Sequence, residues 1–589
     1  MCMLIGMVAA VPSQAADITL VKDGKSDYAI VFSKGASPSE RLAAQELQFF
    51  LFEISGAKLP IAKEGDKSLK KLIVLGDGGI LKWLKVPIDF KDLGDEGFAI
   101  KTSGPHLVIA GGKLRGTMYG VYTFLEDLGC RWYTSKVSYI PKQRTITLKP
   151  LDIVQKPDFE YREPFYTDAW DPDWAARNKT NSSHARLDEA RGGKVAYGRF
   201  VHTFAELIPP AKYYKDHPEY FSLVDGKRQD GYAQVCMSNP DVLKIATDTV
   251  MKWIEENPNA KIFSVSQNDC GKNCQCDACK AVDTEEGSPS GLLLRFVNQI
   301  AAEVEKKYPN VLIDTLAYQW TEKPPKITKP RANVRVRLCP ISACEFHPYE
   351  QCENNAGFVS NLREWNKVTG NLYIWHYNTD FANYLMPFPD LDELATSIPM
   401  YKRTGVKGMF MQGTYNAGSG PAGFMDELKA YLIAKLLWNT DADPKAIRAD
   451  FTNGYFGKAA KPINEWLDLL HNKVRTDNIH GGIYIGVDAP YLTSEIMAEG
   501  DRLFDEAEKL ADNPDVLERV KHARLSLEYV KIIRECGSIG ANGTPEQKAE
   551  TLVKLEAFIK ECEADGITQL NEGCPIRTRF DQLAAPLKK

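Results

Sequence analysis

The stretch Lys261–Asp269, with the sequence KIFSVSQND, gives the clearest indication of the fold. An apolar run with β-branched and aromatic residues ends in polar side chains, which is typical of a buried strand that opens into a loop. We predict a strand at 261–266. The same pattern recurs along the middle of the chain, where the connections are long enough to include helices. It predicts six further strands of a parallel sheet, at 159–165, 200–204, 311–317, 334–338, 372–375 and 406–411.

These seven strands lie within residues 158–440, a span of about 280 residues. A (β/α)8 barrel usually takes about 250 residues. An open doubly wound sheet is the alternative, but no glycine-rich phosphate fingerprint follows any of the strands. We therefore predict an α/β fold with a TIM-like (β/α)8 barrel over 158–440, its eighth strand unassigned.

The barrel is flanked by two regions of different character. Residues 17–150 combine short β-rich runs with a helix opened by Ser37-Pro38-Ser39-Glu40, which predicts a small α+β domain. Residues 441–589 are predicted to form an α-helical region, because 501–531 and 545–562 carry helical periodicity with abundant charge. We expect no residue of this last region to take part in chemistry.

The N-terminus has features of an export signal. Met1–Val11 is a short apolar run, and Ser13-Gln14-Ala15 before Ala16 fits a small-x-small cleavage site. A basic segment before the run is missing, so either the true start of the chain lies upstream or the run is an apolar N-terminal strand. We predict a signal peptide over 1–16, a periplasmic or secreted location, and no transmembrane segment, since no other stretch has the required length.

The composition excludes several classes of protein. The 589 residues carry a net charge of -5, with 44% hydrophobic and 26% charged residues, which is ordinary for a globular protein. Without a basic surface, nucleic acid is not an expected partner. The aromatic content of 10% slightly favours a sugar ligand, because flat apolar sugar faces stack on aromatic rings.

Polar and aromatic residues follow nearly every predicted strand. In a (β/α) barrel the active site lies at the carboxyl ends of the strands, so these side chains are the candidate site. Aromatic rings, amides and carboxylates together suit a carbohydrate. The candidate residues are Asp168, Trp170, His202, Asn268, Asp269, Tyr318, Trp320, Glu345, Trp375, His376, Asn378 and Tyr415.

Among these, Asp269 and Glu345 are the candidate catalytic carboxylates. Glycoside hydrolysis usually needs an acid for the leaving oxygen and a second group to stabilise or attack the developing cation. With a 2-acetamido sugar the substrate's own amide can be the nucleophile, and Asn268 could then hold that amide. The alternatives are a helix-capping or turn role for Asp269 and a surface position for Glu345.

Other chemistries lack their motifs. The chain has no H-E-x-x-H, G-x-S-x-G or G-x-x-x-x-G-K-[ST] sequence, and no cofactor is expected. Cysteines crowd together after Asp269, at 270, 274, 276 and 279. Cys274, Cys276 and Cys279 are open to two interpretations, a structural metal site or disulfides. In neither case do we expect a metal to touch the substrate.

Several motifs resemble those of known carbohydrate-active families. The segments 37–47 and 115–133 resemble the N-terminal domain that precedes the barrel in α-glucuronidases and β-hexosaminidases. The segments 217–221, 265–279 and 427–438 resemble the domain DUF4838, placed in glycoside hydrolase family 163. This resemblance implies a retaining endo-β-N-acetylglucosaminidase that acts on complex N-glycans with help from the substrate acetamido group. It carries over no catalytic residue.

The leading hypothesis is therefore a glycoside hydrolase that cleaves β-N-acetylglucosaminyl linkages of a glycan or glycoprotein. One alternative is an α-glucuronidase-like hydrolase, which would need basic residues to bind the uronate. None of the strand-end residues above is Arg or Lys. The other alternative is a non-catalytic glycan-binding protein.

Overall fold

The structure is a computed structural model that describes residues 17–64, 70–415 and 423–589. The predicted signal peptide over 1–16 lies outside the described residues. The chain divides into two compact units. The first consists of residues up to Arg131 together with Ser138–Pro157 and Asp188–Gly193, and the second contains the rest.

The first unit is built on a six-stranded mixed sheet. Helices α1 (Pro38–Ser55) and α4 (Gly116–Asp127) pack against each other and against this sheet. Ser37 and Glu40 form the capping box that begins α1, because each side chain accepts a hydrogen bond from the other residue's backbone N–H. The strand order is β10 (Asp152–Gln155), β5 (Phe98–Ser103), β6 (His106–Gly111), β4 (Lys71–Leu75), β2 (Tyr28–Phe32) and β3 (Ile61–Lys63).

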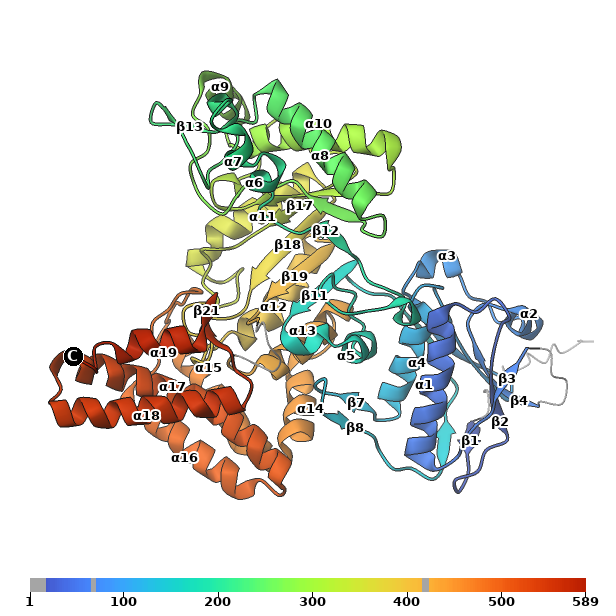
Figure 1. Cartoon of the computed structure of the whole chain (residues 1–589). Coiled ribbons are helices and arrows are strands. Elements are labelled where there is room, and N and C mark those ends of the chain that lie inside the picture. The colour runs from blue at the N-terminus through green and yellow to red at the C-terminus, as the bar shows by residue number, and fades with distance from the viewer. Residues whose placement is uncertain (1–16, 65–69, 416–422) are drawn as a thin grey trace, which may run out of the picture. The chain divides into compact units, whose positions relative to one another are not determined.

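The second unit is built on a curled parallel sheet of seven strands, consistent with a TIM-like barrel (Figure 1). Six of the seven predicted strands are confirmed to within a few residues. The sheet order is β11 (Tyr161–Phe165), β19 (Gly408–Gln412), β18 (Leu372–Tyr377), β17 (Val334–Leu338), β16 (Leu312–Ala317), β15 (Ile262–Ser264) and β12 (Tyr197–Arg199).

The predicted strand at 200–204 is wrong. The strand in that place is β12, which ends at Arg199, and helix α6 (Phe204–Leu207) begins where the prediction had a strand. The chain turns at His202, whose φ is 55°, and the backbone N–H of Thr203 then donates to Ser266 O at 3.1 Å. The apolar residues here pack as a turn and a helix start instead of pairing.

The two end strands of the sheet, β11 and β12, approach each other, but no backbone pairing between them is found in the described residues. Tyr161 and Tyr197, one from each strand, have ring centroids 5.6 Å apart. Aromatic packing thus joins these two end strands, and the eighth strand that the sequence left unassigned is not found among the described residues. Within the described residues the barrel has seven strands.

Beyond residue 440 the chain is mostly helical, as predicted, and lies in the second unit. The stretch 501–531, for which helical periodicity was predicted, is shared by two helices, since Asn513 caps a new helix and Pro514 occupies its first turn. No helix of the described part is long and apolar enough to cross a bilayer. The helices are α14 (Pro444–Phe456), α15 (Ala460–Thr476), α16 (Ser494–Leu510), α17 (Pro514–Asn542), α18 (Pro545–Ala564) and α19 (Ile576–Ala584).

A short hairpin interrupts these helices, with strands β20 (Gln569–Asn571) and β21 (Cys574–Pro575). It is held against the loop that follows β18. The backbone N–H of Tyr384 donates to Leu570 O and that of Glu572 donates to Phe381 O, both at 2.9 Å. These bonds bring the turn of the hairpin to the carboxyl edge of the parallel sheet.

Candidate active site

The carboxyl edge of the seven-stranded sheet holds a cavity of about 300 Å³. Its position is the one at which barrel proteins bind ligands. Carboxylates, histidines and many aromatic rings share its wall. The lining residues are Phe165, His184, Phe200, His202, Asp269, Leu316, Tyr318, Cys339, Ile341, Trp375, Tyr377, Phe381, Phe410, Gln412, Tyr415, Tyr484 and Glu572.

Strand periodicity explains much of this lining. Successive side chains of a strand point to opposite faces of the sheet, so every second residue faces the barrel interior. On β18, Trp375 and Tyr377 line the cavity, whereas His376 between them is buried on the other side. The same inward position at or just after a strand end is occupied by Phe165, Leu316, Cys339 and Gln412.

Asp269 is one of two carboxylates in the cavity. It follows β15 after a loop of four buried residues, and its own side chain is exposed. The Tyr318 hydroxyl donates to Asp269 Oδ1 at 3.0 Å, and the Asp269 backbone N–H donates to the Tyr232 hydroxyl at 2.9 Å. These bonds fix both the loop and the carboxylate that it carries.

Glu572, in the turn between β20 and β21, is the second carboxylate. Gln412 Nε2 donates to Glu572 Oε1 at 3.4 Å, and Trp375 Nε1 donates to Gln412 Oε1 at 2.7 Å. Although its side chain is exposed at the rim of the cavity, partial desolvation raises the pKa of Glu572. The negative charge of Asp269 adds to this rise, and the bond from Gln412 opposes it.

The two histidines of the cavity are held differently. His202 Nδ1 lies 2.8 Å from Gln267 O, and burial lowers the pKa of His202, which favours the neutral ring. His184 Nδ1 lies 2.8 Å from Glu163 Oε1, a fully buried carboxylate. Neither arrangement leaves both ring nitrogens free for a ligand.

A buried ion pair lies behind two rings of the cavity wall, although neither of its residues is part of the lining. Arg337 Nη2 contacts Asp314 Oδ2 at 2.5 Å and donates to Phe200 O at 2.6 Å. The guanidinium also lies over the rings of Phe200 and Trp375, at 4.4 and 5.2 Å from their centroids. Burial raises the pKa of Asp314 and Arg337 counteracts the rise. This pair fixes two cavity-lining rings from behind.

Five of the residues predicted from the sequence line the cavity together: His202, Asp269, Tyr318, Trp375 and Tyr415.

Glu345, predicted as a catalytic carboxylate, lies elsewhere. It is fully buried, and the Tyr349 hydroxyl lies 2.9 and 2.8 Å from its two carboxylate oxygens. His376 Nε2 lies 3.7 Å from Glu345 and 3.1 Å from Glu393. Burial raises the pKa of Glu345 well above its ordinary value. Glu345 and His376 thus form a closed buried cluster behind the strands and do not line the cavity.

The side chain of Asn268 is also occupied by backbone groups. Its Oδ1 accepts from Ala205 N at 3.0 Å, and its Nδ2 donates to Ala233 O at 2.6 Å. Asn268 is buried and does not line the cavity. It holds three segments of chain together beneath Asp269, and its amide is not directed at the ligand space.

The remaining predicted residues serve packing or loop geometry. Asp168 Oδ1 accepts from Ser135 N at 2.8 Å, and the Trp170 ring packs 5.3 Å from that of Phe165. Trp320 Nε1 donates to Cys270 O at 3.3 Å, and Asn378 Nδ2 donates to the Tyr166 hydroxyl. None of these four lines the cavity.

Sequence reasoning missed part of the site. Glu572 and Tyr484 come from the helical region in which no chemistry was expected, so that expectation is corrected as far as the cavity lining is concerned. Neither follows a barrel strand, and no local pattern marks them. Gln412 and Phe165 could have been found from inward alternation on β19 and β11.

Two larger hollows lie away from the strand ends. One of about 1150 Å³ is walled by helices and contains both charged and apolar residues, and one of about 850 Å³ lies between α17 and α18. Neither combines two carboxylates with an aromatic wall. The cavity at the sheet edge therefore remains the candidate active site.

Fold and cavity together define a protein with a TIM-like parallel sheet and a carboxylate-bearing cavity at its carboxyl edge. The chain belongs to the family described as Domain of unknown function (DUF4838), which matches residues 132–468, more than half of the chain. Residues 19–124 match the Glycosyl hydrolase family 67 N-terminus. Comparison with curated proteins finds no match.

Among solved structures, the chain is similar to BtGH115A, a family GH115 4-O-methyl-α-glucuronidase with specificity for decorated arabinogalactans. The TM-score is 0.58 at 13% identity, over 97% of this chain and 80% of that one. A second similar structure is the Flavobacterium johnsoniae chitobiase FjGH20, with a TM-score of 0.45 at 11% identity, over 98% of this chain and 99% of that one. At such identity the first likeness establishes the fold alone.

Proposed function

We propose that the protein is a glycoside hydrolase and that the cavity at the sheet edge is its active site. The observation that carries the proposal is the presence of Asp269 and Glu572 in one aromatic-walled cavity. Two carboxylates facing a shared space are the usual requirement of glycoside hydrolysis. No cofactor is needed for this chemistry.

The surroundings of the two carboxylates suggest different roles. Glu572, whose pKa is raised, is suited to protonate the leaving oxygen as general acid. Asp269, which accepts the Tyr318 hydrogen bond, is suited to stabilise the positive charge that develops on the sugar or its acetamido group. In this assignment Glu572, which only folding brings to the cavity, takes the place of Glu345 as the second catalytic carboxylate.

For the substrate, we propose β-N-acetylglucosaminyl linkages of complex N-glycans, cleaved with retention and with the substrate acetamido group as nucleophile. A cavity of about 300 Å³ is at the small end of ligand pockets, which suits one buried sugar unit. Its nine aromatic rings offer stacking surfaces. Because Asn268 is occupied by backbone groups, Asp269 would be the group that accepts the acetamido N–H.

An α-glucuronidase-like activity is the second candidate, favoured by the family 67 N-terminus over residues 19–124. Recognition of a uronate carboxylate normally uses Arg or Lys. Among the described lining residues the only candidate cations are His184 and His202, and burial lowers the pKa of His202. Charge therefore favours a neutral sugar.

The test is turnover of defined substrates by the full-length protein. We expect release of oligosaccharide from a complex N-glycoprotein and no release of uronic acid from a glucuronidated glycan. Asp269→Asn and Glu572→Gln should each abolish most of this activity, whereas the exposed control Glu546→Gln should retain it. Release of uronic acid alone would favour the second candidate, and binding of glycan without turnover would identify a non-catalytic binding protein.

A further inference from the structure

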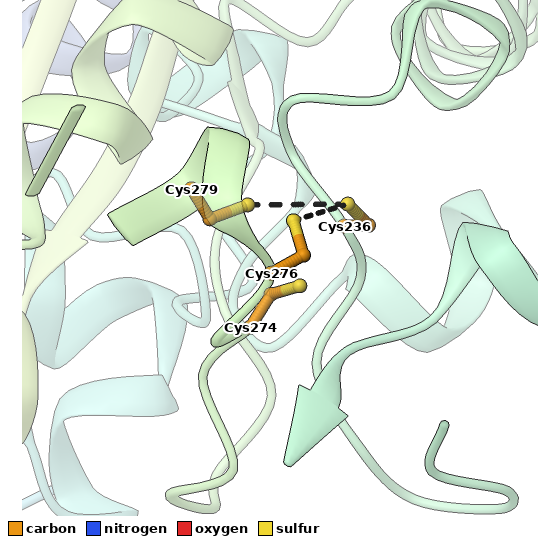
Figure 2. Close-up of side chains that lie close together, drawn as sticks. All are labelled: Cys236, Cys274, Cys276 and Cys279. Carbon is orange, nitrogen blue, oxygen red and sulfur yellow. Dashed lines mark hydrogen bonds between the residues drawn. The ribbon is translucent and has the colours of Figure 1, made fainter. Parts of the chain in front are cut away.

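Four cysteine side chains converge beside the loop that carries Asp269. Figure 2 shows Cys236 facing Cys274, Cys276 and Cys279, and all four Sγ atoms lie within 4.8 Å of one another. The Sγ of Cys236 is 3.8 Å from that of Cys276 and 3.9 Å from that of Cys279. The fourth member, Cys236, is 38 positions before Cys274 in the chain, so only the fold reveals it.

These separations fit a tetrahedral metal site and not disulfides. A disulfide holds its sulfurs at about 2.05 Å. Four sulfurs bound at about 2.3 Å to one tetrahedral zinc ion lie about 3.8 Å apart, from the geometry of the tetrahedron. The distances from Cys236 match the second value. Cys236, Cys274 and Cys279 are buried and Cys276 is half-buried, as in a closed structural site.

The groups around the cysteines suit bound thiolates. Leu223 N donates to Cys274 Sγ at 3.3 Å, and Arg228 Nη1 lies 3.9 Å from the same sulfur. The Ser238 hydroxyl lies 3.2 Å from Cys279 Sγ. Such donors stabilise the excess negative charge of four thiolates around a divalent ion.

We propose that Cys236, Cys274, Cys276 and Cys279 bind one structural Zn²⁺. The ion would join the segment before helix α8 (Pro240–Glu256) to the start of helix α9 (Asp277–Glu286). The segment before α8 also contains Gln234, whose side chain accepts from Asn268 N and donates to Asn268 O. The ion thereby acts as a brace for the loop of Asp269 and does not contact substrate.

A separate group of two cysteines and two histidines forms a second possible metal site, independent of the first. Ligand atoms of Cys344, His347, Cys352 and His480 all lie within 4.8 Å of one another. Cys344 Sγ is 3.5 Å from His347 Nδ1, and Cys352 Sγ is 3.5 Å from His480 Nδ1. Zinc bonds of about 2.3 Å to sulfur and about 2.05 Å to nitrogen put such atoms about 3.6 Å apart in a tetrahedron. We infer that these four residues bind a second Zn²⁺.

The second site would also support the cavity. It joins the loop after β17 to the segment after α15, where Glu345 N donates to Gly481 O at 2.8 Å. Ile483 lies two residues after Gly481, and its carbonyl oxygen accepts a hydrogen bond from the Phe381 N–H at 2.8 Å. The next residue, Tyr484, is part of the cavity wall. Each ion would therefore hold one cavity-lining segment in place.

The experiment measures zinc in the full-length protein, purified without chelator, by elemental mass spectrometry. We expect two zinc ions per chain, one in Cys276→Ser, one in His480→Asn, and two in the control Cys536→Ser, whose cysteine is buried and outside both groups. Cobalt substitution should give strong thiolate-to-cobalt absorption, most of which is lost in Cys276→Ser.

The parent protein alone can overturn the proposal, so a variant that fails to fold does not obscure the result. Fewer than one zinc per chain, even after refolding with zinc, would overturn both sites. If the parent protein holds one zinc per chain, the two variants show which site is empty. The first site is overturned if Cys276→Ser still holds that zinc, and the second site is overturned if His480→Asn still holds it. Mass spectrometry after alkylation without reduction is a second readout, since cysteines of either group found in disulfides would overturn that site.

Discussion

Gln412, at the carboxyl end of β19, donates a hydrogen bond to Glu572, which lies 160 positions further along the chain. The same amide accepts a hydrogen bond from Trp375 on the neighbouring strand. Through this bond a barrel strand holds a carboxylate of the C-terminal hairpin in the cavity. The proposed roles of Glu572 and its partner Asp269 lead to several predictions.

The first prediction separates the two carboxylates by leaving group. Glu572→Gln removes the transferable proton, so turnover of a natural glycan should fall by about 10² to 10⁴-fold. An aryl glycoside with an activated phenol needs little protonation and should lose much less. Asp269→Asn should impair both substrates to a similar extent, because charge develops on the sugar with either leaving group. The reverse pattern would make Asp269 the acid.

The second prediction concerns pH. A general acid works in its protonated form, so kcat/KM on an unactivated substrate should fall as pH rises through the pKa of Glu572. Gln412→Met removes a hydrogen bond that lowers this pKa, and should move the basic limb to higher pH. Asp269→Asn removes a negative charge that raises it, and should move the limb of the residual activity to lower pH. If both variants moved the basic limb in the same direction, Gln412 and Asp269 would not have opposite effects on the pKa of Glu572.

The third prediction tests the ion pair behind the cavity wall. Arg337→Met leaves the Asp314 carboxylate buried without its partner, and should lower the free energy of unfolding by about 3 to 5 kcal/mol. The double variant Asp314→Leu/Arg337→Met should be less destabilised than the single one. Arg331→Met, which breaks an exposed pair with Glu305, is the control and should cost under about 1 kcal/mol. Denaturant unfolding followed by tryptophan fluorescence measures all three, and a double variant at least as destabilised as Arg337→Met would contradict the pairing.

The fourth prediction concerns Asn268. Asn268→Ala leaves the backbone N–H of Ala205 and the carbonyl of Ala233 without partners, at a cost of about 1 to 3 kcal/mol each. The melting temperature should therefore fall clearly, and binding of N-acetylglucosamine at low temperature should be nearly unchanged. An unchanged melting temperature with weakened sugar binding would instead mean that Asn268 contacts the acetamido group.

Much of the parallel sheet could be predicted because its buried strands are rich in apolar, β-branched and aromatic residues, although β11 and β17 also contain charged side chains. The exception is β12, which has three half-buried residues, one of them Gly198, and carries little of that signal. The more apolar stretch that follows it, 200–204, is half-buried at first and buried from Thr203 onward, through packing and not through strand pairing. Hydrophobicity alone does not distinguish these two ways of burying a chain.

The site was predictable only where it follows the strands. Tyr318 comes directly after β16, and His202 and Asp269 follow β12 and β15 within five residues, so position in the sequence was enough to find them. Glu345 also follows a strand, but its loop folds inward and surrounds it with buried polar groups. Glu572 depends on the pairing of a distant hairpin with the loop after β18, which no local pattern records.

The hairpin at 569–575 has a consequence for biosynthesis. All seven strands and most of the aromatic wall emerge from the ribosome well before Glu572 does, since 160 residues separate it from the last of them. A nascent or truncated chain that ends within α17 already contains most of the aromatic wall and Asp269, but it lacks the second carboxylate. Under the proposed function, such a chain would have the surface that holds a glycan without the acid that cleaves it, so hydrolysis would begin only once the end of the helical region has been made and folded back.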